Sequence, residues 1–157
     1  MALPILHRQL ILDDFVTRLT ALKTITEGVD YRHKLVTVDQ KPRTVEQVDS
    51  LETPMVFIVG GDGPGSNQLP SHSDQDALDV VVQGYVRPDA TRFPNLTAPQ
   101  LVEEVMADVE KAIDGDLGHG ARVFGSRRFR VVIHDIEGAW SAFILTEECK
   151  YNRRRAS

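Results

Sequence analysis

The chain has 157 residues, of which 41% are hydrophobic and 26% charged, a composition typical of one soluble globular domain spanning residues 1–157. Its formal net charge of −5 argues against a broad nucleic-acid-binding surface, which needs clustered Lys and Arg. The single cysteine, Cys149, excludes an intrachain disulfide, and no apolar run approaches the roughly 18 residues of a membrane span. The N-terminal segment is interrupted by His7, Arg8 and Asp13, so we expect no signal peptide.

The first half of the chain contains a predicted helix, two predicted strands and a polar connection. Apolar residues recur at helical spacing between Pro4 and Thr26, which predicts an amphipathic helix. A short strand is expected over Tyr31–Asp39, followed by the charged loop Gln40–Glu52. The apolar run Pro54–Val59 is typical of a strand that is buried on both faces.

A segment rich in Gly, Pro, Ser and Asn follows, from Gly60 to Ser73, and predicts a long mobile loop. Its GGDGPG motif invites comparison with phosphate-binding loops, but no Lys-Ser or Lys-Thr pair follows and no helix begins there. We therefore expect an arm that orders only against a neighbouring molecule.

The second half begins with a long predicted strand, Asp76–Val86, whose apolar residues alternate with polar ones. A helix is predicted next, because Thr97 and Gln100 have the spacing of a capping box and Gly115 suits the helix end. On this helix we interpret Glu104 and Asp108 as part of a solvated face.

A final pair of strands, Val131–Ile136 and Trp140–Leu145, is predicted to form a hairpin around Glu137-Gly138. The tail Lys150–Ser157 holds four basic residues and no acid, so residues 1–149 carry 14 basic against 23 acidic groups, or −9. This tail either contacts phosphate or an acidic neighbour, or is a solvated terminus. The fold class predicted is α+β, with a mixed or antiparallel sheet of four to five strands and two helices packed on one face.

No pattern in the chain indicates a catalytic or metal site. The five histidines show none of the HxH or HxxxH spacings of metal ligands, and adjacent His72, Ser73 and Asp74 cannot form the geometry of a hydrolase triad. Cys149 is interpreted as a buried structural thiol. We therefore expect no catalytic residue, no cofactor and no metal.

The residues that we select are interface candidates, each weighed against ordinary solvated surface. They belong to the predicted arm, to the basic tail and to the segment beside Gly125. The candidates are Asp62, Asn67, Gln68, His72, Arg127, Arg128, Arg153, Arg154 and Arg155.

The order and spacing of the elements resemble the tail terminator proteins of long-tailed bacteriophages, over nearly the whole chain. In that family an N-terminal helix precedes a PxxxV strand, a Gly-rich loop, a long strand ending in G-Y/F-V, a helix of the form LxxDVxxAL and a final hairpin. The corresponding segments here are Arg18–Ile25, Pro54–Val59, Asp79–Arg87 with Gly84-Tyr85-Val86, Val105–Ile113 with Asp108, and Ala142–Tyr151.

The resemblance implies a non-enzymatic protein that forms a ring, commonly of six copies, and caps the tail tube. Such a ring stops tail polymerisation and joins the tail to the head connector at the neck end of the virion tail, after assembly in the host cytoplasm. The implied partners are further copies of the chain, the tail tube protein and connector or neck proteins. The tail sheath is left open as a partner, DNA only passes through the lumen, and no membrane is involved.

Two other functions stay open at this point. One is a related neck, head–tail joining or tail-completion protein, which would also be oligomeric. The other is a nucleotide-binding enzyme that uses the loop Gly60–Gly65.

Overall fold

The computed structural model describes residues 7–61, 75–89, 91–115, 123–135 and 139–152. Within these residues the chain forms two α-helices, two short 3-10 helices and five strands, which is an α+β fold as predicted. The elements are α1 (His7–Ala21), β1 (Thr37–Asp39), η1 (Val45–Gln47), η2 (Ser50–Glu52), β2 (Met55–Gly61), β3 (Gln75–Val86), α2 (Ala98–Asp114), β4 (Val123–His134) and β5 (Ser141–Asn152).

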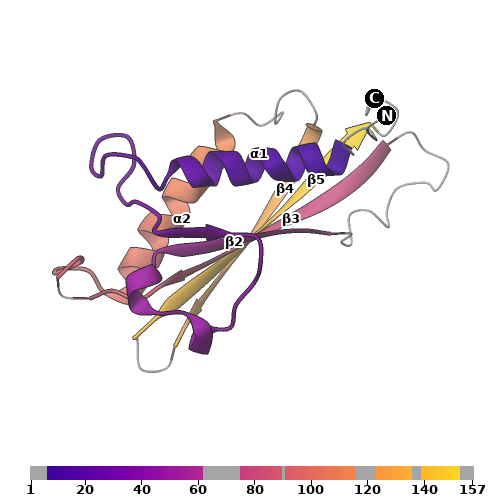
Figure 1. Cartoon of the computed structure of the whole chain (residues 1–157). Coiled ribbons are helices and arrows are strands. Elements are labelled where there is room, and N and C mark those ends of the chain that lie inside the picture. Colours follow the sequence, from indigo (N-terminus) through magenta and orange to yellow (C-terminus); the bar gives the residue numbers. More distant parts are fainter. Residues whose placement is uncertain (1–6, 62–74, 90, 116–122, 136–138, 153–157) are drawn as a thin grey trace, which may run out of the picture.

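The strands form a single mixed sheet in the order β1-β2-β3-β5-β4 (Figure 1). The short strand β1 is parallel to β2, and every other neighbouring pair is antiparallel. The two central strands, β3 and β5, pair over their full length, from Gln75 opposite Asn152 to Val86 opposite Ser141. The sheet therefore ends in a three-residue edge strand on one side and a twelve-residue edge strand, β4, on the other.

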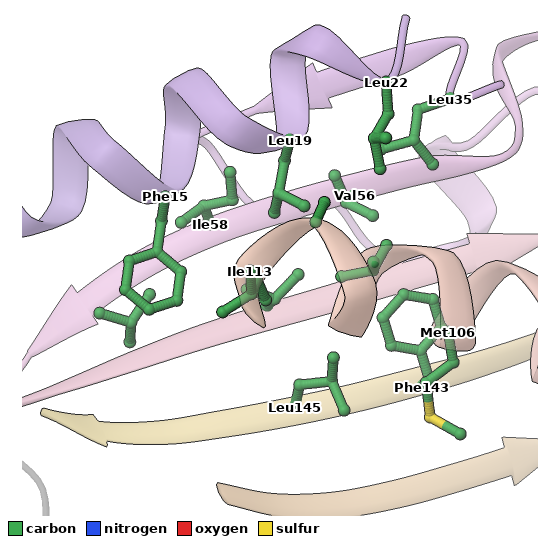
Figure 2. Packing of buried hydrophobic residues seen from close by; sticks show 14 of the residues in the cluster. Phe15, Leu19, Leu22, Leu35, Val56, Ile58, Met106, Ile113, Phe143 and Leu145 are labelled. Atoms are coloured by element: carbon green, nitrogen blue, oxygen red, sulfur yellow. The ribbon is translucent and has the colours of Figure 1, made fainter. Parts of the chain in front are cut away.

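Both helices cover one face of this sheet, as predicted, and enclose the main hydrophobic core (Figure 1). From α1, the side chains of Phe15 and Leu19 point towards Val56 and Ile58 of β2 (Figure 2). Helix α2 begins at the predicted capping box: the Thr97 hydroxyl accepts a bond from the Gln100 N–H, and the Gln100 side chain accepts one from the Thr97 N–H. Its stripe of buried residues consists of Leu101, Val102, Val105, Met106, Val109, Ala112 and Ile113.

A second, smaller core lies on the opposite face of the sheet. The segment that carries η1 and η2 folds over Met55 and Phe57 of β2 and Tyr85 of β3. The apolar run of β2 is thus buried on both faces from Met55 to Ile58, as its composition predicted, whereas Val59 is exposed. The expected charged loop Gln40–Glu52 therefore has a structural function as the cover of this second core.

The ring of Phe143 occupies the space that a side chain at position 84 would need, so this position requires a glycine. A Cβ atom built on Gly84 would lie 2.2 Å from Cε1 of Phe143, whose side chain is fully buried against the helices. Gly84 belongs to the Gly-Tyr-Val end of the predicted long strand, which the structure confirms over Gln75–Val86.

Several predicted boundaries are wrong. Helix α1 is described from His7 and ends at Ala21, before the predicted Thr26. The strand expected over Tyr31–Asp39 is reduced to β1, because the N–H groups of Arg32 and His33 bond to the side chain of Asp108 instead of to a strand. Tertiary contacts thus override the local strand preference there.

The final hairpin is longer than predicted. Its strands run over Val123–His134 and Ser141–Asn152, and His134 pairs with Ser141. The predicted turn at Glu137-Gly138 lies outside the described residues. The tail expected from Lys150 begins later, because Tyr151 is buried and its hydroxyl donates to Asp76.

Candidate protein-interaction surface

An uncovered apolar area lies on the sheet face opposite the helices, beyond the reach of the second core. Its most exposed side chains are Phe129, Val131 and Ile133 of β4, at 42%, 52% and 42%, and Val59 of β2, at 38%. Half-buried residues of the central strands connect them. We name this area the open face; its residues are Val59, Val81, Phe129, Val131, Ile133, Ile144 and Thr146.

The strand register makes the open face continuous from β2 to β4. Val59 lies opposite Val81, Val81 opposite Thr146, and Thr146 opposite Phe129. Val131 lies opposite Ile144. Because directly opposite residues of neighbouring strands share a face, these side chains form one patch and not scattered exposed residues.

The side chains of β4 alternate between the two faces of the sheet, which explains why this patch reaches the edge strand. In the sequence Arg127–His134 every second residue points away from the helices, and these positions hold Arg127, Phe129, Val131 and Ile133. The intervening positions face α2 and hold the two arginines that bond to it, Arg128 and Arg130. The edge strand thus has one apolar face and one ionic face.

Charged residues border one end of the open face. The guanidinium of Arg127 lies 4.8 Å from the centre of the Phe129 ring, in a cation–π contact. Arg127 lies opposite Glu148 of β5, which in turn lies opposite Asp79 of β3. Of the predicted interface residues within the described part of the chain, Arg127 is the one that the structure places at this exposed patch.

Arg128, the other described candidate, lies in an ionic cluster within its own subunit. Its guanidinium bonds to Glu147 of β5 at 2.6 Å and to Glu110 and Asp114 of α2 at 3.2 and 2.5 Å. These contacts raise the pKa of Arg128 even though its burial acts to lower it. Three acids of its own chain thus surround Arg128, and its contact with an acidic neighbour stays a prediction.

Arg130 completes this cluster by a two-pronged bond to Glu110, with both nitrogen–oxygen distances at 2.6 Å. The hydrogen bond from Arg130 is the main reason that the pKa of Glu110 lies below its usual 4.5, although partial burial opposes the shift. The cluster ties α2 to the two last strands. All of these ion pairs join elements within one chain.

Sequence reasoning missed a second polar contact, between α2 and the segment before β1. Asp108 is buried, and its carboxylate accepts the N–H groups of Arg32 and His33 at 2.9 to 3.2 Å. One turn earlier, Glu104 lies 3.0 Å from Nε2 of His33. The interpretation of Glu104 and Asp108 as a solvated face is wrong, and the position of Asp108 between the buried Val105 and Val109 was the signal for it.

A wide depression of about 900 Å³ lies beside the ionic cluster of Arg128 and Arg130, bordered by Tyr31, Glu110 and Arg130 among others. Arg130 pairs there with Glu110, and Lys111 lies over the ring of Tyr31. The described residues contain no group of three or more His, Cys, Asp or Glu side chains arranged to hold a metal ion. In the same residues, no helix has the length and apolar character needed to cross a membrane.

The remaining predicted residues cannot be placed at a site. Asp62, Asn67, Gln68, His72, Arg153, Arg154 and Arg155 lie outside the described residues. The predicted glycine loop starts later than expected, because Gly60 and Gly61 belong to β2 and pair with Val80 and Asp79.

Comparison with known proteins adds no relative to this description. A scan of protein-family models finds no match to the chain, and a search of curated proteins finds no matching sequence.

Proposed function

We propose that this chain is a non-enzymatic assembly protein that caps the tail tube of a long-tailed bacteriophage. Copies of the chain form a ring, commonly of six members, which stops tail polymerisation and joins the tail to the head connector. What supports the proposal is the order of the sequence elements, from the first helix to the final hairpin, together with a surface suited to protein contacts.

The observation that carries the proposal is the open face. Contiguous exposed apolar patches on single soluble chains mark sites that another molecule covers. Here the patch lies on the sheet, extends to β4, which is an edge strand among the described elements, and is bordered by charge at Arg127 and Glu148. A patch of this kind fits contact with a flat protein surface better than it fits a small ligand.

A ring requires that two different patches on each copy fit one another, so that the contact repeats until it closes. The open face supplies one apolar patch. The acidic body of the chain, −9 over residues 1–149, would repel DNA weakly in a lumen and let it slide through. Acidic residues confined to the outer rim of an assembled ring would argue against this second point.

The experiment that tests the proposal mixes the purified chain with the tail tube protein of the same phage during tube polymerisation. Negative-stain images should show shorter tubes with a ring at one end. Tubes of unchanged length without terminal rings would contradict the proposed function.

A matched pair of variants tests whether the open face contributes to capping. Val131→Glu places a charge at its most exposed residue, whereas Val29→Glu places the same charge on a residue that is 73% exposed in the loop after α1. Capping should be lost in the first variant and retained in the second. Equal capping by both variants would show that the open face does not contribute.

A further inference from the structure

We propose that the free protein forms a two-fold dimer by antiparallel pairing of β4 with β4 of a second copy, centred on Val131. The inference goes beyond the proposed function, because a two-fold contact is self-complementary and cannot by itself continue around a ring. It concerns the chain in solution, before any partner is present.

Among the described elements, none pairs with the outer edge of β4. A long, apolar edge strand exposes a row of unpaired N–H and C=O groups, and native proteins usually shorten, twist or cover such strands. Strand β4 is twelve residues long, and its only irregularity in register lies between Val123 and Gly125, at its start. From Arg127 onwards the strand is regular, and it carries the most exposed part of the open face.

The alternation of side chains along β4 restricts the register in which two copies can pair. Directly opposite residues of an antiparallel pair share a face, so the open faces of two copies join only if the paired residue numbers have an even sum. Centring the pair on Val131 places Phe129 of each copy opposite Ile133 of the other. The open face of each copy is then continuous with that of the other.

Charge favours one register. With Val131 on the axis, Arg127 lies opposite Asp135 of the second copy, the residue that directly follows β4, and these opposite charges lie on the same face. The same carboxylate also accepts the N–H groups of Ala139 and Trp140 in its own chain.

Centring on Phe129 would place Arg128 opposite Arg130, and centring on Arg130 would place that residue opposite its own copy. Centring on Val132 or Ile133 would place Asp135 opposite the apolar Phe129 or Val131. Among these registers, all of which join the open faces, the one centred on Val131 avoids such conflicts.

The size of the contact sets its strength. A stretch of nine residues, from Arg127 to Asp135, is roughly 30 Å long at the usual rise of a strand. One added ladder of this length buries less than the area of roughly 1,200 Å² at which stable complexes begin. We therefore expect a dimer that dissociates on dilution into the micromolar range, which leaves the edge accessible to other partners.

Disulfide trapping tests the register, because the native cysteine, Cys149, is fully buried. In Val131→Cys the two new thiols face each other across the axis, at a Cα separation of roughly 4.5 to 5.5 Å that a disulfide can span. This variant should form a covalent dimer under mild oxidation. Phe129→Cys or Ile133→Cys alone should not, because each pair of identical positions is then about 14 Å apart along the strand.

A mixture of Phe129→Cys and Ile133→Cys proteins should cross-link, because the proposed register makes these two positions partners. Dimers of Val131→Cys no more abundant than those of the single variants at 129 and 133 would overturn the proposal.

Sedimentation velocity of the unmodified protein provides a test that needs no variant. The weight-average mass should rise from monomer to dimer between about 1 and 200 µM. A monomer over this whole range would overturn the proposal, whereas Arg127→Glu should weaken the dimer at least tenfold and Lys41→Glu, a charge change outside the sheet, should not. Failure of the dimer leaves the tube-capping result unaffected, so the two proposals fail separately.

Discussion

At the scale of single residues, the contact of Gly84 with Phe143 leaves no room for a side chain at position 84. An added methyl at position 84 would lie 2.2 Å from a ring that is fully buried. We expect Gly84→Ala to lower the free energy of unfolding by about 1–3 kcal/mol or more, measured by urea denaturation.

Two further variants show whether this clash is the cause. Gly61→Ala, in β2, adds its methyl where no heavy atom lies within 4 Å, so it should be nearly neutral. Phe143→Leu combined with Gly84→Ala should cost less than the sum of the two single changes, because the smaller side chain leaves room for the methyl. Additive costs would contradict the steric explanation.

A second residue-scale prediction concerns Cys149, the one thiol of the chain. Burial raises the pKa of Cys149 to about 12, and the nearby charges of Glu147 and Asp79 act in the same direction. The thiolate that reacts with disulfide reagents is therefore nearly absent near pH 8. The folded protein should resist labelling by a chromogenic disulfide reagent and react fully once denatured; rapid labelling of the folded protein would contradict this.

Sequence reasoning identified Cys149 as buried because an uncharged, apolar residue in a strand is usually part of a core. It did not predict the burial of Arg128 and Asp108, because charged residues are normally solvated. Their burial depends on partners far along the chain, Glu147 for Arg128 and the N–H groups of residues 32 and 33 for Asp108. A pattern of neighbouring residues in the sequence cannot reveal pairing between positions so far apart in the chain.

At the scale of elements, the cluster around Arg128 attaches α2 to β4 and β5. Glu147 is only 3% exposed, and Arg128 is its closest cation, at 2.6 Å. Replacing one partner of a buried pair leaves the other charge without compensation, so Arg128→Gln should lower the free energy of unfolding by about 3–5 kcal/mol. Arg32→Gln, whose side chain is mostly exposed, should have little effect in the same urea titration.

The pH dependence of stability provides a second prediction at this scale. Because the folded-state pKa of Glu110 lies below its unfolded value of 4.5, this carboxylate stabilises the fold fully above that pH. The contribution is lost as the pH falls through the lower, folded-state pKa. Glu110→Gln should therefore be less stable than the unmodified protein near pH 7, and the difference should shrink below pH 4.5 in denaturant unfolding.

Glu103→Gln is the control for this titration, because Glu103 is an exposed residue of the same helix. Its difference from the unmodified protein should be small at every pH. A Glu110→Gln difference that stays constant down to about pH 3 would show that the pairing with Arg130 does not stabilise the folded state.

The elements that the sequence predicted well are those specified by local chemistry. The capping box of Thr97 and Gln100 and the alternation of Gln75–Val86 define α2 and β3 almost to the residue. The connection before β1 could not be predicted, since its backbone conformation depends on Asp108 of a helix that is more than seventy residues distant in the chain.

At the scale of the whole molecule, the sheet order predicts a gradient of local stability. Strands β3 and β5 pair on both sides and bury residues in the main core, whereas β1 is a three-residue edge strand with half-buried residues. Amide hydrogens of β3 and β5 should exchange only on global unfolding, and those of β1 by local opening.

Hydrogen–deuterium exchange followed by mass spectrometry measures this gradient. Peptides from β1 should exchange first and those from β3 and β5 last. Strand β4 should become better protected as the protein concentration rises, if the two-fold contact forms. Equal exchange of β1 and β3 would contradict the order.

The second core and the open face lie on the same side of the same strands. A line across the sheet therefore separates residues selected for packing in the core from residues selected for contact with other molecules. On β2 it runs between Phe57, buried beneath the η segments, and Val59; on β5 it runs between Ala142 and Ile144. Descendants of this chain that keep the fold should retain apolar residues on the covered side of that line. On the other side, substitutions should depend on the surfaces of the molecules that the chain contacts. Two positions on the same face of a strand, two residues apart, would then evolve at different rates.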